Sequence, residues 1–319
     1  MNRKKSLGNI LKSIPFVFSF ITIAILIFLI NILLSSTDFL KEESVSNIVR
    51  KSYYAFFIPT SDQAFFNGLK KGAMAAEEDF DCYVSFYSID NNIMDLNMVP
   101  FLGINGIALY PLGKSSEIKD QIKFLEEYGI PVIQIENEVL RDKNTFYVGT
   151  NNFESGRAIG EISKRTEKDL LNIQIIYSEK NPGLLSNKSI VELGLKSSLG
   201  DKINKLDYTI TSLNPLDAER IVYEIVKNSP EVDLIVLTDP NDSLVAVQAI
   251  IDSNMVGEIQ IISFGDSDEI LNYMDKGVIL GSIVRNPYEI GYNAVKSLYE
   301  IENTGFTSSY LDTGIKTLW

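Results

Sequence analysis

Short runs of apolar residues alternate with segments of helical periodicity along most of this chain of 319 residues, and this alternation constrains its fold most strongly. The apolar runs lie at 53–58, 83–87, 106–109, 131–135, 173–177, 234–237 and 259–264. The helical patterns lie at 66–79, 116–128, 153–166, 189–199, 215–228, 240–253 and 267–276. Continuous apolar strands separated by helices are typical of parallel sheets, because each crossover lays a helix against a face of the sheet. The sequence therefore predicts an α/β fold. Because the alternating region exceeds what one sheet comfortably holds, we expect two lobes.

Residues 14–34 carry no charge, and at a rise of about 1.5 Å per residue this run covers a hydrocarbon core of about 30 Å. Basic residues precede it at Arg3, Lys4, Lys5 and Lys12. Because basic residues stay on the cytoplasmic side, the pattern predicts a single-pass transmembrane anchor, with 1–13 in the cytoplasm, a stalk at 35–52 and everything beyond it outside. The alternative is a signal peptide cleaved near Ser35 or Ser36, although the apolar core of such peptides is normally shorter.

Charge and composition exclude several classes of function. The 29 Lys and Arg residues against 42 Asp and Glu residues give a formal charge of −13, the wrong sign for binding nucleic-acid phosphates. The absence of histidine excludes histidine-dependent triads and removes the commonest zinc ligand. The single cysteine, Cys82, permits neither an intrachain disulfide nor a thiolate cluster, and no glycine-rich phosphate loop is present. We therefore expect no enzyme, no metal and no cofactor.

Ligands of parallel α/β sheets bind beyond the carboxyl ends of the strands. After the first predicted strand, Gln63 is followed by two adjacent aromatic residues, Phe65 and Phe66, at a helix start. An aromatic face there can stack on a sugar ring while the polar side chain bonds a hydroxyl group. The structural alternative is one ring in the core and one on the surface.

Polar side chains also follow later strands. Glu136 and Asn137 follow one apolar run, and Asp239 follows another. A carboxylate accepts hydrogen bonds from two adjacent hydroxyl groups, which suits a sugar site. Without a ligand role, Glu136 is a solvated loop charge, and Asp239, which precedes Pro240, is a helix N-cap.

Asp266 has the same two interpretations, a ligand contact or the cap of the next helix. Arg157 has Glu154 and Glu161 at neighbouring helical positions, which favours a surface ion pair. Arg285 lies at the exit of an apolar strand, which favours a ligand contact.

Several motifs resemble the type I periplasmic sugar-binding proteins, the superfamily of the ribose-binding proteins and the lactose-repressor core. They are TSDQAFFNGLKKG at 60–72, VGTNNFESGRAIG at 148–160, LIVLTDPNDSLVAVQA at 234–249, residues 261–268 and RNPYEIG at 285–291. The resemblance implies two Rossmann-like lobes joined by three crossovers, with a sugar in the cleft between them. It places lobe one at 50–151 and 286–311 and lobe two at 152–285 and 312–319.

The resemblance also implies which residues contact the sugar. The ring would lie between Phe65 and Phe66, with Gln63 beside them. The other matching positions are Glu136, Asn137, Lys188 or its neighbour Asn187, Asp239, Asp266 and Arg285. Ribose binders carry Arg where this chain has Asn137, and they differ at Asp239 and Arg285 too. Because these changes exchange hydrogen-bond donors and acceptors, we expect a sugar other than ribose, a pentose or a small hexose.

We therefore expect an extracytoplasmic, membrane-anchored receptor that closes on a monosaccharide, a pentose such as xylose being favoured. Anchored xylose-sensing members of the family suggest the extracellular domain of a sensor histidine kinase as the partner. The alternative is the substrate-binding subunit of an ATP-driven sugar importer, whose partner would be its ABC permease. An alternative of another class is an adhesion or scaffold module without a small ligand.

Overall fold

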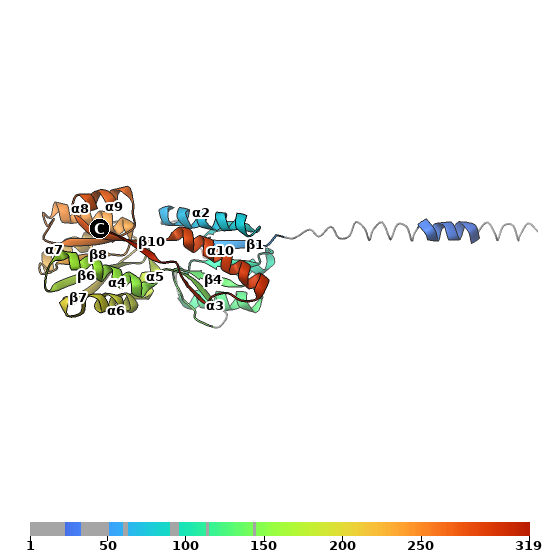
Figure 1. Cartoon of the computed structure of the whole chain (residues 1–319), viewed down its shortest axis with the longest axis horizontal. Coiled ribbons are helices and arrows are strands. Elements are labelled where there is room, and N and C mark those ends of the chain that lie inside the picture. Colours follow the sequence, from blue (N-terminus) through green and yellow to red (C-terminus); the bar gives the residue numbers. More distant parts are fainter. Residues whose placement is uncertain (1–22, 33–50, 60–62, 90–95, 113–114, 143–144) are drawn as a thin grey trace, which may run out of the picture. The chain divides into compact units, whose positions relative to one another are not determined.

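The computed structural model describes residues 23–32, 51–59, 63–89, 96–112, 115–142 and 145–319 (Figure 1). The chain divides into two units, Met1–Arg50 and Lys51–Trp319. In the first unit, residues 23–32 form a helix with exposed side chains, whereas the rest of the predicted anchor and most of the predicted stalk lie outside the described residues. No helix in the described part of the chain is both long and apolar enough to cross a membrane.

The second unit contains two six-stranded sheets. The first sheet and the helices that cover it are called lobe one here, and all of its paired strands are parallel. Its strand order is β11 (Tyr310–Asp312), β5 (Phe146–Gly149), β4 (Val132–Ile135), β3 (Gly106–Leu109), β1 (Tyr53–Ile58) and β2 (Tyr83–Ser88).

The second sheet and its helices are called lobe two. Its strand order is β12 (Ile315–Leu318), β10 (Ile279–Arg285), β9 (Gln260–Phe264), β8 (Leu234–Leu237), β6 (Leu171–Ser178) and β7 (Ile203–Thr211). The strands pair in parallel except that β12 runs antiparallel to β10. The predicted α/β class, with two lobes built on parallel sheets, is confirmed.

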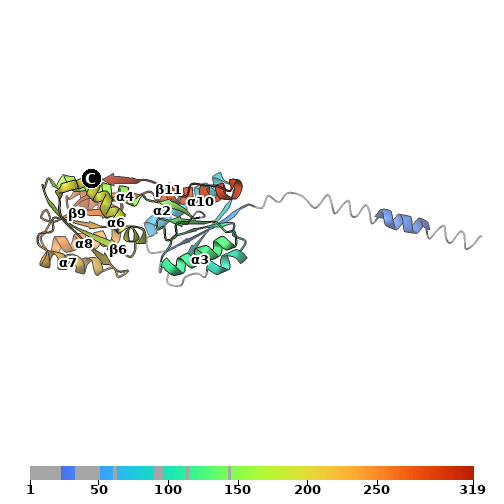
Figure 2. The same cartoon turned by 90° about the horizontal axis from the view of Figure 1, so that it is seen from below.

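Helices cover both faces of the sheet in lobe one (Figures 1 and 2). One face carries α2 (Gln63–Asp79) and α10 (Pro287–Thr304), and the other carries the 3-10 helix η1 (Leu96–Phe101) and α3 (Ser115–Glu127). Along β1, Tyr54 and Phe56 pack in the first core, whereas Ala55 and Phe57 pack in the second. Because successive strand residues point to opposite faces, burial on both sides explains the uninterrupted apolar run.

Lobe two has the same construction. One face carries α4 (Asn152–Ser163), α5 (Pro182–Ser186) and α6 (Lys188–Leu199), and the other carries α7 (Asp217–Asn228), α8 (Pro240–Asp252) and α9 (Asp268–Asp275). Short 3-10 turns, η2 (Lys164–Thr166) and η3 (Gly200–Lys202), follow α4 and α6. Along β8, Leu234 and Val236 face the first group, and Ile235 and Leu237 face the second.

The chain passes between the two sheets after β5, after β10 and after β11. The first passage leads directly into α4, and the second leads directly from β10 into α10. These passages begin at the carboxyl ends of strands, so they bring the strand exits of both lobes toward the same region.

Candidate ligand-binding site

The aromatic pair after β1 lies at the start of α2. Phe65 and Phe66 are 7% and 5% exposed, so neither is a surface ring, and the alternative of one core and one surface ring is wrong. The two rings meet edge to face at a centroid distance of 5.1 Å, and Phe66 meets Tyr110 in the same manner at 5.3 Å. Such edge-to-face contacts fix the orientation of the rings. Helix α2 begins at Gln63, whose side chain lies outside what the structure describes.

Arg285, the last residue of β10 in lobe two, contacts two side chains of lobe one. Its guanidinium carbon lies 4.1 Å from the centroid of the Phe65 ring, and its Nη1 lies 3.5 Å from Oε2 of Glu136. The side chains of Arg285 and Glu136 are 10% and 4% exposed, so water screens this ion pair little. A guanidinium group stacks on an aromatic ring through its face and donates hydrogen bonds through its edge. Three predicted site residues therefore meet where the lobes touch.

The Glu136 carboxylate is held on both of its oxygens. While Oε2 faces Arg285, Oε1 accepts hydrogen bonds from the backbone N–H of Thr150 at 2.9 Å and from the Thr150 hydroxyl at 2.7 Å. The backbone of Glu136 has a φ of 60°, a left-handed conformation that is costly for a residue with a side chain. The alternative that Glu136 is a solvated loop charge is wrong, since the residue is 3% exposed.

Asn137 lies beside Glu136 and is 4% exposed. Its Nδ2 donates to the carbonyl oxygen of Pro111 at 2.9 Å. Its Oδ1 is buried without a hydrogen-bond partner. An acceptor in this state suits a ligand that brings a donor.

Asp239 caps α8, as one of its two sequence interpretations predicted. Its Oδ1 accepts hydrogen bonds from the backbone N–H groups of Asn241 and Asp242, both at 3.0 Å, and Pro240 takes the first helical turn. The residue is only 4% exposed. The cap of α8 accounts for a carboxylate at this position. A contact between Asp239 and a ligand stays a prediction.

Sequence reasoning missed a polar group at the exits of β6 and β8. Asn181 is 2% exposed, and its Nδ2 donates to the carbonyl oxygen of Thr238 at 2.9 Å. Next to it, Lys180 pairs with Asp242, whose other oxygen accepts a hydrogen bond from the Thr211 hydroxyl at 2.6 Å. The available signal was the position of Lys180 and Asn181 directly after a long apolar strand.

Two predicted site residues, Lys188 and Asp266, make no described contact with Phe65, Glu136 or Arg285. Lys188 places its Nζ 5.4 Å from the centroid of the Tyr208 ring, on the edge strand β7. Asp266 is exposed, and the cap of α9 is Ser267, whose hydroxyl accepts a hydrogen bond from Ile270. The alternative that Asp266 caps this helix is therefore wrong. Ligand contacts of both residues stay predictions.

Arg157 lies on α4 with its Nη1 3.4 Å from Oε1 of Glu154, and both side chains are about half exposed. The predicted surface ion pair is confirmed. The other predicted neighbour, Glu161, pairs with Lys164 instead.

A cavity of about 240 Å³ opens at the exits of β1 and β2 in lobe one. It is lined by Ile58, Pro59, Phe66, Asn67, Lys70, Phe86, Tyr87 and Ser88. Phe66 thus contacts Phe65 and Tyr110 and also lines this cavity. The structure describes no group of acidic or cysteine side chains arranged to hold a metal ion among these residues or elsewhere in its described part.

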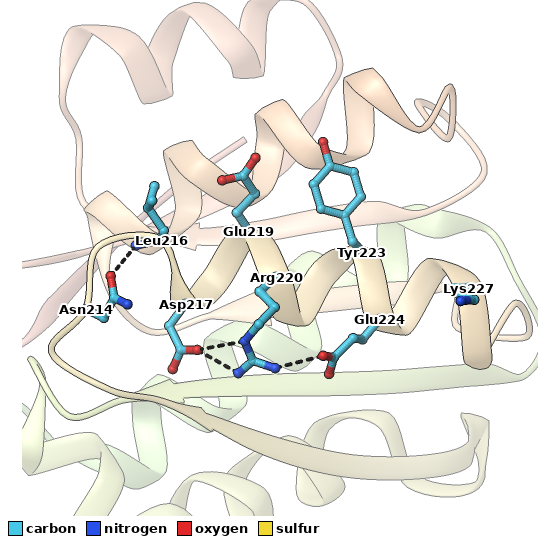
Figure 3. Close-up of a pocket in the computed structure, with 8 residues that line it drawn as sticks. All are labelled: Asn214, Leu216, Asp217, Glu219, Arg220, Tyr223, Glu224 and Lys227. Carbon is cyan, nitrogen blue, oxygen red and sulfur yellow. Dashed lines mark hydrogen bonds and ion pairs between the residues drawn. The ribbon is translucent and has the colours of Figure 1, made fainter.

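A groove of about 490 Å³ runs along α7 (Figure 3). Three of its charged groups pair with one another, because Arg220 donates to Asp217 at 2.6 Å and to Glu224 at 2.8 Å. Figure 3 shows these three side chains along one side of the helix and Glu219 and Tyr223 along another. Since no polar groups from other elements converge on it, we do not regard this groove as the ligand site.

Comparisons with known proteins agree with this architecture. Residues 54–305 match the model of the periplasmic binding protein domain. Similar solved structures include GanP, a glucose-galactose binding protein from Geobacillus stearothermophilus, with 22% identity and a TM-score of 0.74 over 84% of this chain and 98% of that one. They also include XylFII, with 23% identity and a TM-score of 0.69 over 84% and 98% of the two chains.

A structure of the XylFII-LytSN complex is similar as well, with 22% identity and a TM-score of 0.70 over 84% of this chain and 97% of that one. At these identities the likeness concerns the fold. A search of curated proteins finds no match. Since the matched domain spans most of the chain, including both sheets apart from β11 and β12, the chain belongs to the periplasmic binding protein family.

Proposed function

We propose that this chain is a membrane-anchored, extracytoplasmic receptor that closes on a monosaccharide and signals the closure to a sensor kinase. The observation that carries the proposal is Arg285, which extends from lobe two to the ring of Phe65 and the carboxylate of Glu136 in lobe one. A ligand that bonds to groups of both lobes adds contacts that exist only when the lobes are closed. Binding and lobe closure are then thermodynamically linked.

The chemistry of these groups favours a neutral polyol. Phe65 and Phe66 offer apolar ring faces for the C–H surface of a sugar, and Arg285 offers several N–H donors for hydroxyl oxygens. The opposite charges of Arg285 and Glu136 already balance each other, so a charged ligand would leave one of them unpaired in a buried place. A sugar needs no counter-charge.

A pentose such as xylose is the favoured sugar. Gly183 of lobe two lies directly against Glu136 of lobe one, because a Cβ atom built on Gly183 would meet the Glu136 carbonyl oxygen at 2.2 Å. Arg285 also covers a face of Phe65. A ring without the exocyclic carbon arm of a hexose needs less space beside these contacts, which favours a pentose.

A sensor kinase is the favoured partner because the uncharged run at 14–34 would keep the receptor beside one membrane neighbour. The similar protein XylFII has been solved in complex with LytSN, which is a precedent for a partner-bound member of this fold. The rival is a sugar importer, which a similar structure titled as the sugar-binding protein of a sugar ABC transporter exemplifies. A receptor released by cleavage after residue 34 would favour the importer.

The test is calorimetry of the purified full-length chain with pentoses and hexoses. We expect heat with at least one pentose and weaker or no heat with hexoses. No heat with any sugar would overturn the proposal and favour a scaffold role. Purification from native membranes then identifies the partner, because a co-purifying kinase supports sensing and a permease supports import.

A further inference from the structure

Asn181, at the exit of β6 in lobe two, carries a buried amide oxygen without a hydrogen-bond partner. Its Nδ2 donates to the carbonyl oxygen of Thr238. A carbonyl oxygen can only accept, so this bond fixes which end of the amide is the nitrogen. Oδ1 therefore occupies the opposite side of the amide, away from Thr238.

Asn137 of lobe one repeats this arrangement. Its Nδ2 donates to the Pro111 carbonyl oxygen at 2.9 Å, and its Oδ1 is buried and unpaired. In the described part of the chain, the other buried side-chain atoms without partners belong to Ser85, Glu126 and Ser263, none of which is an amide. The two unpaired amides, Asn137 and Asn181, both follow the carboxyl ends of strands. Buried acceptors are normally satisfied, and a pair left open at such edges points to a ligand.

The two amides lie on either side of one contact between the lobes. A Cβ atom built on Gly183 would lie 2.2 Å from the carbonyl oxygen of Glu136 and 3.7 Å from the backbone nitrogen of Asn137. Asn181 precedes Gly183 by two residues, which span at most about 7 Å. Asn137 and Asn181 are thus close enough for one small molecule to reach both.

We infer that Asn181 is a specificity-determining residue that accepts a hydrogen bond from a ligand hydroxyl. This inference rests on the proposed function and narrows it, because the ligand must donate one hydroxyl hydrogen to Asn181 in lobe two and another to Asn137 in lobe one. The Glu136 carboxylate, next to Asn137 in the chain, is already bound through both oxygens by Arg285 and Thr150. The two amide oxygens are buried acceptors without partners, so a sugar that lacks either hydroxyl leaves one of them unpaired.

The test compares the sugar that binds best with its monodeoxy analogues, by calorimetry of the full-length chain. The native protein should bind two of the analogues at least about tenfold more weakly than the parent sugar, because each lacks the hydroxyl group that one of the two amides accepts from. In Asn181→Ala, the parent sugar should lose about tenfold in affinity, and the discrimination against one of these two analogues should disappear. A purely structural role would weaken parent and analogue equally and leave the discrimination intact.

Asn172→Ala is the matched control. Asn172 lies at the other end of β6, and its Nδ2 donates to the Glu231 carbonyl oxygen at 2.8 Å, so the same side-chain bond is lost away from the site. The affinity of Asn172→Ala for the parent sugar should stay within about twofold of the native value. If Asn181→Ala does not melt like the native protein, Asn181→Leu, which preserves the volume, takes its place.

Three outcomes separate the hypotheses. Loss of discrimination in the Asn181 variant alone supports the inference. Native discrimination in that variant overturns the inference and leaves the proposed receptor function standing. An absence of heat with every sugar in the native protein overturns the receptor function and this inference together.

Discussion

The two lobes share a construction but differ in the chemistry at their strand exits. In each, one pair of helices approaches so closely that only glycine fits at the contact. A Cβ atom on Gly72 of α2 would lie 1.9 Å from the carbonyl oxygen of Tyr288 on α10, and one on Gly156 of α4 would lie 1.9 Å from that of Val191 on α6. The packing of the frame is thus the same in both halves.

The strand exits differ because lobe one contributes mainly aromatic rings and lobe two mainly polar groups. Phe65, Phe66 and Tyr110 form a cluster of edge-to-face contacts in lobe one. Asn181 and Asp242 lie in a buried polar network in lobe two. The comparison indicates that the frame tolerates different chemistry at its strand exits. We expect the side chains there, rather than the fold, to decide what is bound.

The largest expected effect tests the shared frame. Gly72→Leu and Gly156→Leu should each cost more than the about 1–3 kcal/mol typical of overpacking, because the obstacle is backbone that cannot move aside. We expect both variants to lose the cooperative unfolding transition in urea. Met74→Leu, on the exposed side of α2, is the control and should unfold like the native protein. A native-like transition in only one glycine variant would show that the lobes are not packed alike.

The next effect tests whether lobe two depends on its buried ion pair. In Asp242→Ala, the Lys180 side chain, which is 12% exposed, keeps its charge without a partner carboxylate, and the Thr211 hydroxyl keeps only its 3.3 Å bond to the Tyr177 carbonyl oxygen. We therefore expect a loss of about 3–5 kcal/mol. Glu224→Ala, which breaks an exposed pair on α7, should cost less than about 1 kcal/mol in the same urea experiment. Lys180→Met combined with Asp242→Leu should regain most of the loss. An Asp242→Ala variant as stable as Glu224→Ala would contradict this account.

A smaller effect tests the aromatic side of the comparison. Phe65→Leu removes the ring under Arg285 but keeps an apolar side chain of similar size, so stability should fall by less than about 1.5 kcal/mol. Sugar affinity, measured by calorimetry, should fall about fivefold, since stacking contributes about 1 kcal/mol. Phe65→Ala is less informative, because emptying a buried aromatic position costs about 3–5 kcal/mol of stability. Unchanged affinity in Phe65→Leu would remove this ring from the site.

Much of the frame could be predicted from the sequence because burial on both faces leaves a strong local signal. The runs that became β1, β3, β8 and β9 are continuous and apolar for that reason. β7 was not predicted because it is an edge strand with mostly exposed residues, and its pattern is set by one neighbour, β6. β11 and β12 were missed because three or four residues carry too little pattern.

The site was predicted in part, for a similar reason. Phe65, Glu136 and Arg285 were found because each lies at or shortly after the end of a recognisable strand, whereas their meeting depends on the passages between the lobes. Asn181 escaped because an Asn-Pro-Gly sequence is typical of an ordinary turn, and only the bond to Thr238 reveals its unpaired oxygen. Sequence reasoning locates strand exits, but it does not count the hydrogen bonds made there.

The smallest expected effect uses the only thiol, Cys82, which reports on lobe one alone. Burial, with a smaller contribution from the Glu77 carboxylate, raises the pKa of Cys82 from 9.0 to about 11. As the pH rises past 9, the unfolded chain loses the thiol proton while the folded chain keeps it. The contribution of the protonated thiol to the free energy of unfolding is therefore complete below pH 9 and disappears as the pH rises toward 11. Between pH 8 and 9.5 the native protein should lose about 0.8 kcal/mol more than Cys82→Ala does, from the usual 1.36 kcal/mol per pKa unit. The free energies of unfolding are measured in urea for both proteins at these two pH values. Tyrosines also titrate in this pH range, but both proteins have the same tyrosines, so the difference between the two losses comes from the thiol. Equal losses in both would mean that water reaches Cys82, and the core beneath α2 would then be looser than its counterpart in lobe two.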